Sequence, residues 1–389
     1  MIRLYSWPQD AAPIERAWRE VEERASGVLH YQRFEWFAST ARLSPPERGP
    51  ILVAVVERGG HPSAVLGLRL ARGRLGFPRI LELLRDDHPM ADWTAESGVG
   101  GEQAVDLVRG LRRDPGVSWD VLTLSKLPEE STLLLGLRGA PVDHLDWRWT
   151  DHRHRIDLPG SWAELEERLP RKLRRDLRVG LRRLQEELGD PRFSSCSGTA
   201  PEVAVAARRF AELESSGWKA GAGGGILGSD RGWQVFQDRV ATLGRLGVLR
   251  LNFLEAGDQL VAAQFCAVEQ GEAFFLKTGY AERHSRAGPG HLHLEWLARW
   301  GIDSGLRRID LVSGAEWPLK WRPSAGLLAT AHVYRDGIRA GISRMARRRP
   351  VEEAWEECDC GVAARLNRAD PGGPPAPVGW SRNLGPGEG

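Results

Sequence analysis

The sequence predicts an α/β (α+β) protein made of two halves with the same order of elements. Apolar residues at helical spacing open each half, short apolar runs separated by glycine turns follow, and a further helix and strand close it. A chain of 389 residues is long enough for two domains. The repeated order suggests a duplicated arrangement, although spacing alone does not prove a duplication.

The first half is expected to contain four helices and four strands. Ile14, Ala17, Trp18 and Val21 follow helical spacing, and a Gly59–Gly60 turn separates the first two strands. The expected helices are 11–25, 33–42, 103–111 and 129–137, and the expected strands are 51–56, 63–70, 80–84 and 121–124.

The second half repeats this plan after a linking strand. His152, His154 and Ile156 share one face of that strand, 146–158, by two-residue alternation. The expected helices are 162–188 with a kink at Pro170, 201–215, 233–246 and 291–303, and the expected strands are 248–254, 260–268, 273–279, 309–312 and 328–334. We therefore predict domains at 1–145 and 146–345, with an extension at 346–389 that is disordered from about 370, where Gly and Pro dominate.

The composition is that of an ordinary globular protein and excludes several classes. The formal net charge is only +2, so no overall field favours nucleic acid. The four cysteines do not form a disulfide framework, and Cys358 and Cys360 lack the partners of a zinc site, so no metal is expected. The first residues lack a signal-peptide core, and no window approaches the about 18–20 apolar residues of a membrane span. These features favour a cytoplasmic protein.

A glycine-rich turn between a strand and a helix is the strongest functional signal. The strand 273–279 ends in Lys277, Gly279 and Tyr280, and the turn at Arg286–Gly290 stands directly before a helical pattern. Such a turn offers unpaired backbone N–H groups and a positive helix end to an anion. The alternatives are a plain strand-to-helix connection and a solvent-facing Lys277. The candidate cofactor-binding residues are Lys277, Thr278, Gly279, Tyr280, Arg286, Gly288 and Gly290.

Charged residues near the next strand are candidates for the chemistry. Acyl transfer to an amine needs a base for the ammonium proton and a cation or N–H donor for the oxyanion. Glu316 and Lys320 follow a strand end, where site residues often collect, and Asp310 lies within that strand. We therefore predict catalytic roles for Glu316, Lys320 and Asp310. The alternative for Glu316 and Lys320 is a surface salt bridge.

Further candidates concern the substrate. Trp218 and Lys219 precede the glycine-rich loop 220–228 and could close over an acceptor or anchor the loop. His152 and His154 could bind substrate, supply a base or form a metal pair, but no third ligand is evident. His291 and His293 do not share a helical face. The helix 171–183 has one apolar and one basic face, which could seat a nucleotide phosphate or RNA, or simply face solvent.

Several segments together resemble the CelD/BcsL-type acetyltransferases of the GNAT superfamily, relatives of the Fem-type aminoacyltransferases. These segments are RKLRRDLRVGLRRLQ, FAELESSGWK, LRLNFLEAGDQLVAAQF, FFLKTGYAERHSRAGPGHLHL and RIDLVSGAEWPLKW. The family's Tyr-Ser-Pro-Gly stands here as Ala287-Gly288-Pro289-Gly290. Its Gly-x-x-x-Tyr-Lys pattern is altered, with Pro318-Leu319 where an aromatic residue often stands before Lys320. The resemblance covers residues 162–321 well and 31–137 loosely.

The resemblance implies tandem GNAT-like domains, each with a mixed, mostly antiparallel sheet flanked by helices. In such a domain the strand 273–279 splays from its neighbour and receives pantetheine, and the turn at Arg286–Gly290 seats the pyrophosphate. The implied function is N-acyl transfer from acyl-CoA, above all acetyl-CoA, to a small-molecule or peptide amine by direct attack. Glu316 is then the general base, and Lys320 stabilises the oxyanion or orients the acceptor.

Two other functions stay open. A Fem-like aminoacyl-tRNA-dependent peptide-bond former would use the basic helix 171–183 to bind tRNA. A degenerate, non-catalytic GNAT would bind a nucleotide or partner, consistent with the missing aromatic residue before Lys320. The sequence leaves the acceptor open, and a monomer or a dimer fits equally.

Overall fold

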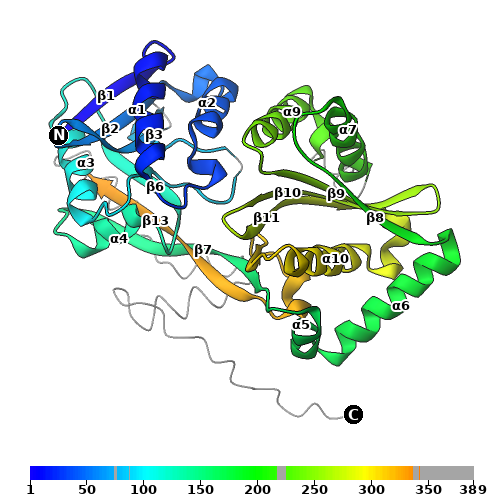
Figure 1. Cartoon of the computed structure of the whole chain (residues 1–389). Helices are drawn as coiled ribbons and strands as arrows, with labels where there is room; N and C mark the ends of the chain where they lie inside the picture. Colours follow the sequence, from blue (N-terminus) through cyan, green and yellow to red (C-terminus); the bar gives the residue numbers. More distant parts are fainter. Residues whose placement is uncertain (74–76, 87, 217–224, 336–340, 342–389) are drawn as a thin grey trace.

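The computed structural model describes residues 1–73, 77–86, 88–216, 225–335 and 341. Figure 1 shows two groups of elements bridged by two long strands, β7 (Leu145–Asp157) and β13 (Ser324–Tyr334). The strands form one sheet in the order β1-β2-β3-β4-β6-β13-β7-β12-β11-β10-β9-β8, with β5 paired to β3. Most neighbours are antiparallel, and helices flank the sheet, so the predicted mixed fold is confirmed.

The first half packs helices on both sides of its strands. Helix α1 buries Ile14, Ala17, Trp18 and Val21, the residues that its periodicity selects. Strand β1 escaped prediction because it is short, lies at the sheet edge and is only partly buried. The elements are β1 (Ile2–Trp7), α1 (Ala11–Arg24), α2 (Phe34–Leu43), β2 (Ile51–Arg58), β3 (His61–Arg72), β4 (Arg79–Leu83), β5 (Thr94–Ala95), α3 (Gly101–Arg113), β6 (Val121–Pro128) and α4 (Thr132–Gly139).

The second half follows the predicted order with one added edge strand, β8. Pro170 separates α5 from α6, because proline lacks the N–H that a continuous helix needs. The elements are α5 (Trp162–Arg168), α6 (Arg171–Leu188), β8 (Pro191–Cys196), α7 (Pro201–Ser216), α9 (Asp230–Arg245), β9 (Leu249–Ala256), β10 (Gln259–Glu269), β11 (Glu272–Tyr280), α10 (Pro289–Asp303) and β12 (Arg308–Asp310). Short 3₁₀ helices include η5 (Glu282–Ala287) and η6 (Trp317–Trp321).

The last strand returns to the first half of the chain. β13 lies between β6 and β7 and is antiparallel to both. Its side chains Leu327, Ala329, Ala331 and Val333 join the core formed by the strands and helices of the first half. The sheet therefore runs continuously from the first half to the second through β13 and β7, although these two neighbouring strands are far apart in the sequence.

Three predicted features fall outside the part of the chain that the structure describes. They are the extension 346–389 with Cys358 and Cys360, the candidate residues Trp218 and Lys219, and residues 220–224 of the glycine-rich loop. Within the described part, no helix combines the length and apolarity needed to cross a bilayer.

Candidate active site

A cavity of about 650 Å³ lies where β11 ends and α10 begins. Its walls come from five separate elements: α7, the end of β11, η5, the start of α10, and η6 with the segment just before it. The lining residues are Glu214, Thr278, Gly279, Tyr280, Ser285, Gly288, Pro289, Gly290, His291, Ala315, Trp317 and Lys320.

The turn before α10 has the geometry of an anion site. Gly288 adopts a left-handed conformation (φ 65°, ψ 46°), which favours glycine, and Pro289 occupies the first helical position. The Gly288 carbonyl accepts the N–H groups of His291 (2.9 Å) and Leu292 (3.2 Å). A Cβ atom at Gly288 or Gly290 would meet nothing within 4 Å. The start of this 15-residue helix is therefore open, with its positive dipole end towards the cavity.

Strand β11 carries an irregularity close to the cavity. Phe265 of β10 pairs with Lys277 and Cys266 pairs with Phe275, so Leu276 is an extra residue without a partner in β10. A bulge of this kind bends the strand and re-aims the following residues. Further along, a Cβ atom on Gly279 would lie 2.8 Å from the Cα atom of Glu214. Glycine at 279 therefore lets α7 approach β11 closely.

The basic helix α6 packs directly on the glycine turn. A Cβ atom at Gly180 would lie 2.1 Å from the Ala287 carbonyl oxygen, so only glycine permits this approach. Arg183 Nη1 donates a hydrogen bond to the Arg286 carbonyl oxygen at 2.8 Å. Five basic residues of α6 are exposed: Arg171, Lys172, Arg175, Arg178 and Arg182. Helix α6 thus contacts the turn through Gly180 and Arg183, and the same helix carries the exposed basic residues.

The η6 segment forms another wall of the cavity through Trp317 and Lys320. Trp321 is buried, and its indole Nε1–H donates to His291 Nδ1 at 3.1 Å. The Trp317 ring centroid lies 5.6 Å from the His291 ring and 6.0 Å from the Phe275 ring. These contacts fix the segment so that Lys320 lines the cavity.

The structure brings six of the predicted residues together at this cavity and places the others that it describes elsewhere. Thr278, Gly279, Tyr280, Gly288, Gly290 and Lys320 line it. Lys277, Arg286 and Glu316 lie in adjoining segments without lining it, and Glu316 is exposed at the start of η6. Trp218 and Lys219 lie outside the described residues.

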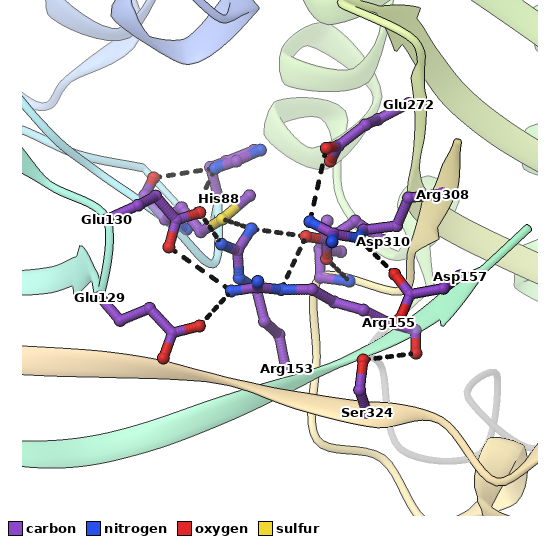
Figure 2. Close-up of polar contacts among 12 residues, drawn as sticks. His88, Glu129, Glu130, Arg153, Arg155, Asp157, Glu272, Arg308, Asp310 and Ser324 are labelled. Atoms are coloured by element: carbon purple, nitrogen blue, oxygen red, sulfur yellow. Dashed lines mark hydrogen bonds and ion pairs between the residues drawn. The ribbon is translucent and has the colours of Figure 1, made fainter. Parts of the chain in front are cut away.

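Asp310 lies in a buried ion network between β7 and β12 (Figure 2). Its carboxylate pairs with Arg153 and accepts the Val312 N–H at 2.8 Å. Burial raises the pKa of Asp310, while Arg153 opposes that shift. Arg155 extends the network to Glu129 at 2.7 Å. Asp310 is thus placed to neutralise buried arginine rather than to contact a substrate in the cavity.

His152 and His154 lie on β7 behind the segment that leads to η6. A Cβ atom at Gly314 would lie 2.6 Å from His152 Cε1, so the imidazole packs against the backbone there. The two rings are 5.0 Å apart, and burial lowers the pKa of both. They support the Gly314 loop without lining the cavity. The described residues contain no group of three or more His, Cys, Asp or Glu side chains able to hold a metal ion.

Sequence reasoning missed Glu214 and His291 as lining residues. Glu214 is buried, and its Oε2 accepts the Ile226 N–H at 2.8 Å. Glu214 stands on a helix more than 60 residues before the turn, and no local pattern links it to β11. His291 directly follows the glycine turn, so its position was a usable signal.

Comparison with known proteins agrees with this geometry. Residues 171–322 match the family model of the acetyltransferase (GNAT) domain. That span contains α6, the glycine turn, the cavity and Lys320. The match lies within the second half of the chain and is to the acetyltransferase (GNAT) domain in general, not to the CelD/BcsL type.

Solved structures share the fold over most of the chain. A structure of FemX is 11 % identical, covers 86 % of this chain and 98 % of its own, and has a TM-score of 0.56. A conserved protein of unknown function from Bacteroides thetaiotaomicron is 12 % identical, covers 86 % and 100 %, and has a TM-score of 0.54. The C-terminal domain of a candidate lysylphosphatidylglycerol synthetase from Agrobacterium fabrum is 14 % identical, covers 86 % and 95 %, and has a TM-score of 0.51.

No curated protein matches the sequence. At these identities the structural likenesses establish the fold alone. The match to the acetyltransferase (GNAT) domain model supports an acyltransferase, and the donor and the acceptor are left to be assigned.

Proposed function

We propose that this protein is an N-acyltransferase that moves an acyl group from acyl-CoA, above all acetyl-CoA, to an amine by direct attack. The observation that carries the proposal is the open start of α10, which faces a cavity that also contains Lys320. The positive end of a helix suits a pyrophosphate. Among the first N–H groups of α10, those of Gly288, His291 and Leu292 bond to backbone carbonyls, which leaves the Gly290 N–H to meet the phosphate. A cavity of about 650 Å³ is large enough for the reacting end of such a donor.

In this proposal the donor runs along the end of β11. The pyrophosphate binds at Gly288–Gly290, with Arg286 nearby, and the pantetheine arm follows residues 277–280. The bulge at Leu276 supports this path because it interrupts the regular pairing of β11 with β10. We also propose that the protein is related to the CelD/BcsL-type acetyltransferases, because several of its segments resemble theirs, among them the glycine turn and the segment that contains Lys320.

Two carboxylates are candidates for the general base. Glu316 is exposed at the start of η6 and would act through a water molecule. Glu214 lines the cavity and is held by the Ile226 N–H. Lys320 supplies positive charge where the oxyanion develops. A Glu316→Gln variant and a Glu214→Gln variant, compared over a pH series, distinguish the two: the variant of the true base loses the limb of the rate profile that reports its deprotonation.

The binding experiment uses calorimetry with acetyl-CoA and CoA. Gly290→Asp adds an acid to the first turn of α10, which suits the helix but repels a phosphate. Because a Cβ atom at Gly290 has open space, the fold should tolerate the change. We expect micromolar binding by the unaltered protein and at least a tenfold loss, about 1.4 kcal/mol, in Gly290→Asp. Lys320→Met should retain binding and lose turnover.

Ala12→Asp is the matched control for that experiment. It adds an acid to the first turn of α1, an exposed position with no acid of its own and far from the cavity. Equal affinities in Gly290→Asp and Ala12→Asp would contradict the proposed pyrophosphate seat. No binding of either nucleotide by the unaltered protein would contradict the acyl-CoA donor.

One observation favours the second candidate function, an aminoacyl-tRNA donor. Helix α6, which contacts the glycine turn through Gly180 and Arg183, also carries exposed arginines that could contact a longer polyanion than CoA. Loss of activity on ribonuclease treatment, with no binding of CoA, would support this alternative.

A further inference from the structure

We propose that His291 is a catalytic residue that donates a hydrogen bond from Nε2–H to the acyl carbonyl oxygen as negative charge develops there. This inference rests on the proposed function, because it assigns a role within the same cavity. It adds a neutral donor to the positive charge of Lys320.

The position of His291 is the first argument. It lines the cavity together with Lys320 and Gly290, and the Lys320 ammonium is near enough to lower the pKa of its imidazole. Its backbone N–H is used in the first turn of α10 through the Gly288 carbonyl. The ring also contacts Trp317, another lining residue, at a centroid distance of 5.6 Å. The side chain is therefore fixed on the cavity wall.

The proton position follows from the Trp321 contact. An indole N–H is only a donor, so the nitrogen that receives it must be an acceptor. Trp321 Nε1 lies 3.1 Å from His291 Nδ1, which places the proton of a neutral imidazole on Nε2. Within the described ranges, Nε2 makes no hydrogen bond to the protein. The Nε2–H group of His291 is thus available as a hydrogen-bond donor to a molecule in the cavity.

The charge state agrees with this assignment. Burial and the neighbouring Lys320 ammonium together lower the pKa of His291 to about 4, and Asp176 of α6 opposes them. The start of α10 also disfavours a cation. A neutral imidazole at a helix start can polarise a carbonyl without giving up its proton.

The reaction balances with His291 unchanged. The amine nitrogen attacks the thioester carbon, and the carbonyl π electrons move to oxygen, where Nε2–H and Lys320 stabilise them. The base removes the amine proton. The C–O double bond then re-forms, the C–S bond breaks with its electron pair on sulfur, and the thiolate accepts a proton. His291 keeps its proton throughout.

The test uses acetyl-CoA labelled with ¹³C at the carbonyl, so no acceptor is needed. The infrared carbonyl stretch of the bound thioester should move to lower frequency in the unaltered protein. His291→Phe keeps a ring but removes this donor, so the shift should fall to the part that Lys320 supplies, while acetyl-CoA affinity changes less than threefold. His291→Gln retains an N–H donor and should keep part of the shift.

A second readout needs no ligand. Nitrogen-15 NMR of the unaltered protein should show His291 protonated at Nε2 and neutral down to about pH 5. A proton on Nδ1, or an undiminished carbonyl shift in acetyl-CoA bound to His291→Phe, would overturn the role of His291. Failure of the unaltered protein to bind acetyl-CoA would instead overturn the proposed function, and this inference with it.

Discussion

His293 and His291 lie two positions apart on α10 but have different surroundings. Whereas His291 lines the cavity, His293 is 0 % exposed beside Phe193 and Trp296. Its two ring nitrogens have no hydrogen-bond partner among the described residues. The two histidines therefore occupy different faces, as their spacing predicts. Burial lowers the pKa of His293 to about 3.

This shift makes stability depend on pH. The folded pKa of His293 lies below the value of about 6.5 of an unfolded histidine, so the unfolded state binds the proton first as the pH falls. The folded state is therefore not penalised by this histidine above about pH 6.5, and its free energy of unfolding falls as the pH drops from there towards 3. Between pH 8 and pH 5 this group alone should lower the free energy of unfolding by about 2 kcal/mol.

His293→Leu should remove this pH-dependent loss of unfolding free energy. Urea unfolding at pH 8 and pH 5 measures the free energy of unfolding at each pH. His144→Asn is the control, because His144 is exposed and its left-handed backbone (φ 56°) tolerates asparagine. Its pH dependence should match that of the unaltered protein. If His293→Leu keeps the full difference between the two pH values, the loss arises from other groups.

Helix α6 packs on the glycine turn, so a change in α6 should affect both stability and the proposed donor site. Gly180→Ala would normally stabilise a helix by about 1 kcal/mol. Here the added Cβ would meet the Ala287 carbonyl at 2.1 Å, so α6 must move. We expect a net loss of about 1–3 kcal/mol in unfolding free energy and weaker acetyl-CoA binding. Thermal unfolding and calorimetry measure the two effects.

Gly290→Ala is the matched comparison for Gly180→Ala. Its Cβ has no neighbour within 4 Å, so the usual helical preference for alanine should prevail and stability should not fall. Equal stability of the two variants would show that α6 does not depend on its close approach to the turn.

The elements themselves were largely predictable from local signals. Helical spacing located α1, α2, α3 and α7 to within a few residues, and Pro170 marked the break between α5 and α6. The edge strands β1 and β8 were missed, because short, partly exposed strands lack a continuous apolar run. The β10–β11 bulge was also missed, since register depends on the partner strand as well as on the chain itself.

The molecule as a whole depends on a strand from its far end. β13 separates β6 from β7 and supplies core residues to the first half. A fragment of residues 1–157 should therefore be poorly packed and bind a hydrophobic dye. The same fragment joined through a flexible linker to residues 324–334 should unfold cooperatively. Cooperative unfolding of 1–157 alone would show that β13 is dispensable to this half.

Long-range assembly also explains why only part of the candidate site was predictable. The glycine turn and Lys320 carry local signals, and the structure brings them to one cavity. Glu214 reaches that cavity only because α7 packs on Gly279. Asp310 looked equally suitable in sequence, but its burial beside Arg153 depends on the pairing of β12 with β7 (Figure 2). Periodicity specifies the face of a strand, not the partner that it meets.

Hydrogen exchange with and without CoA measures where the donor binds. A ligand held at the start of α10 protects the amides that it contacts, together with the elements that it stabilises. We predict slower exchange in residues 276–292, and unchanged exchange in the first half, above all in α1 and β2. Protection confined to the first half, or to the exposed face of α6 without the turn, would contradict the placement of the donor at β11 and α10.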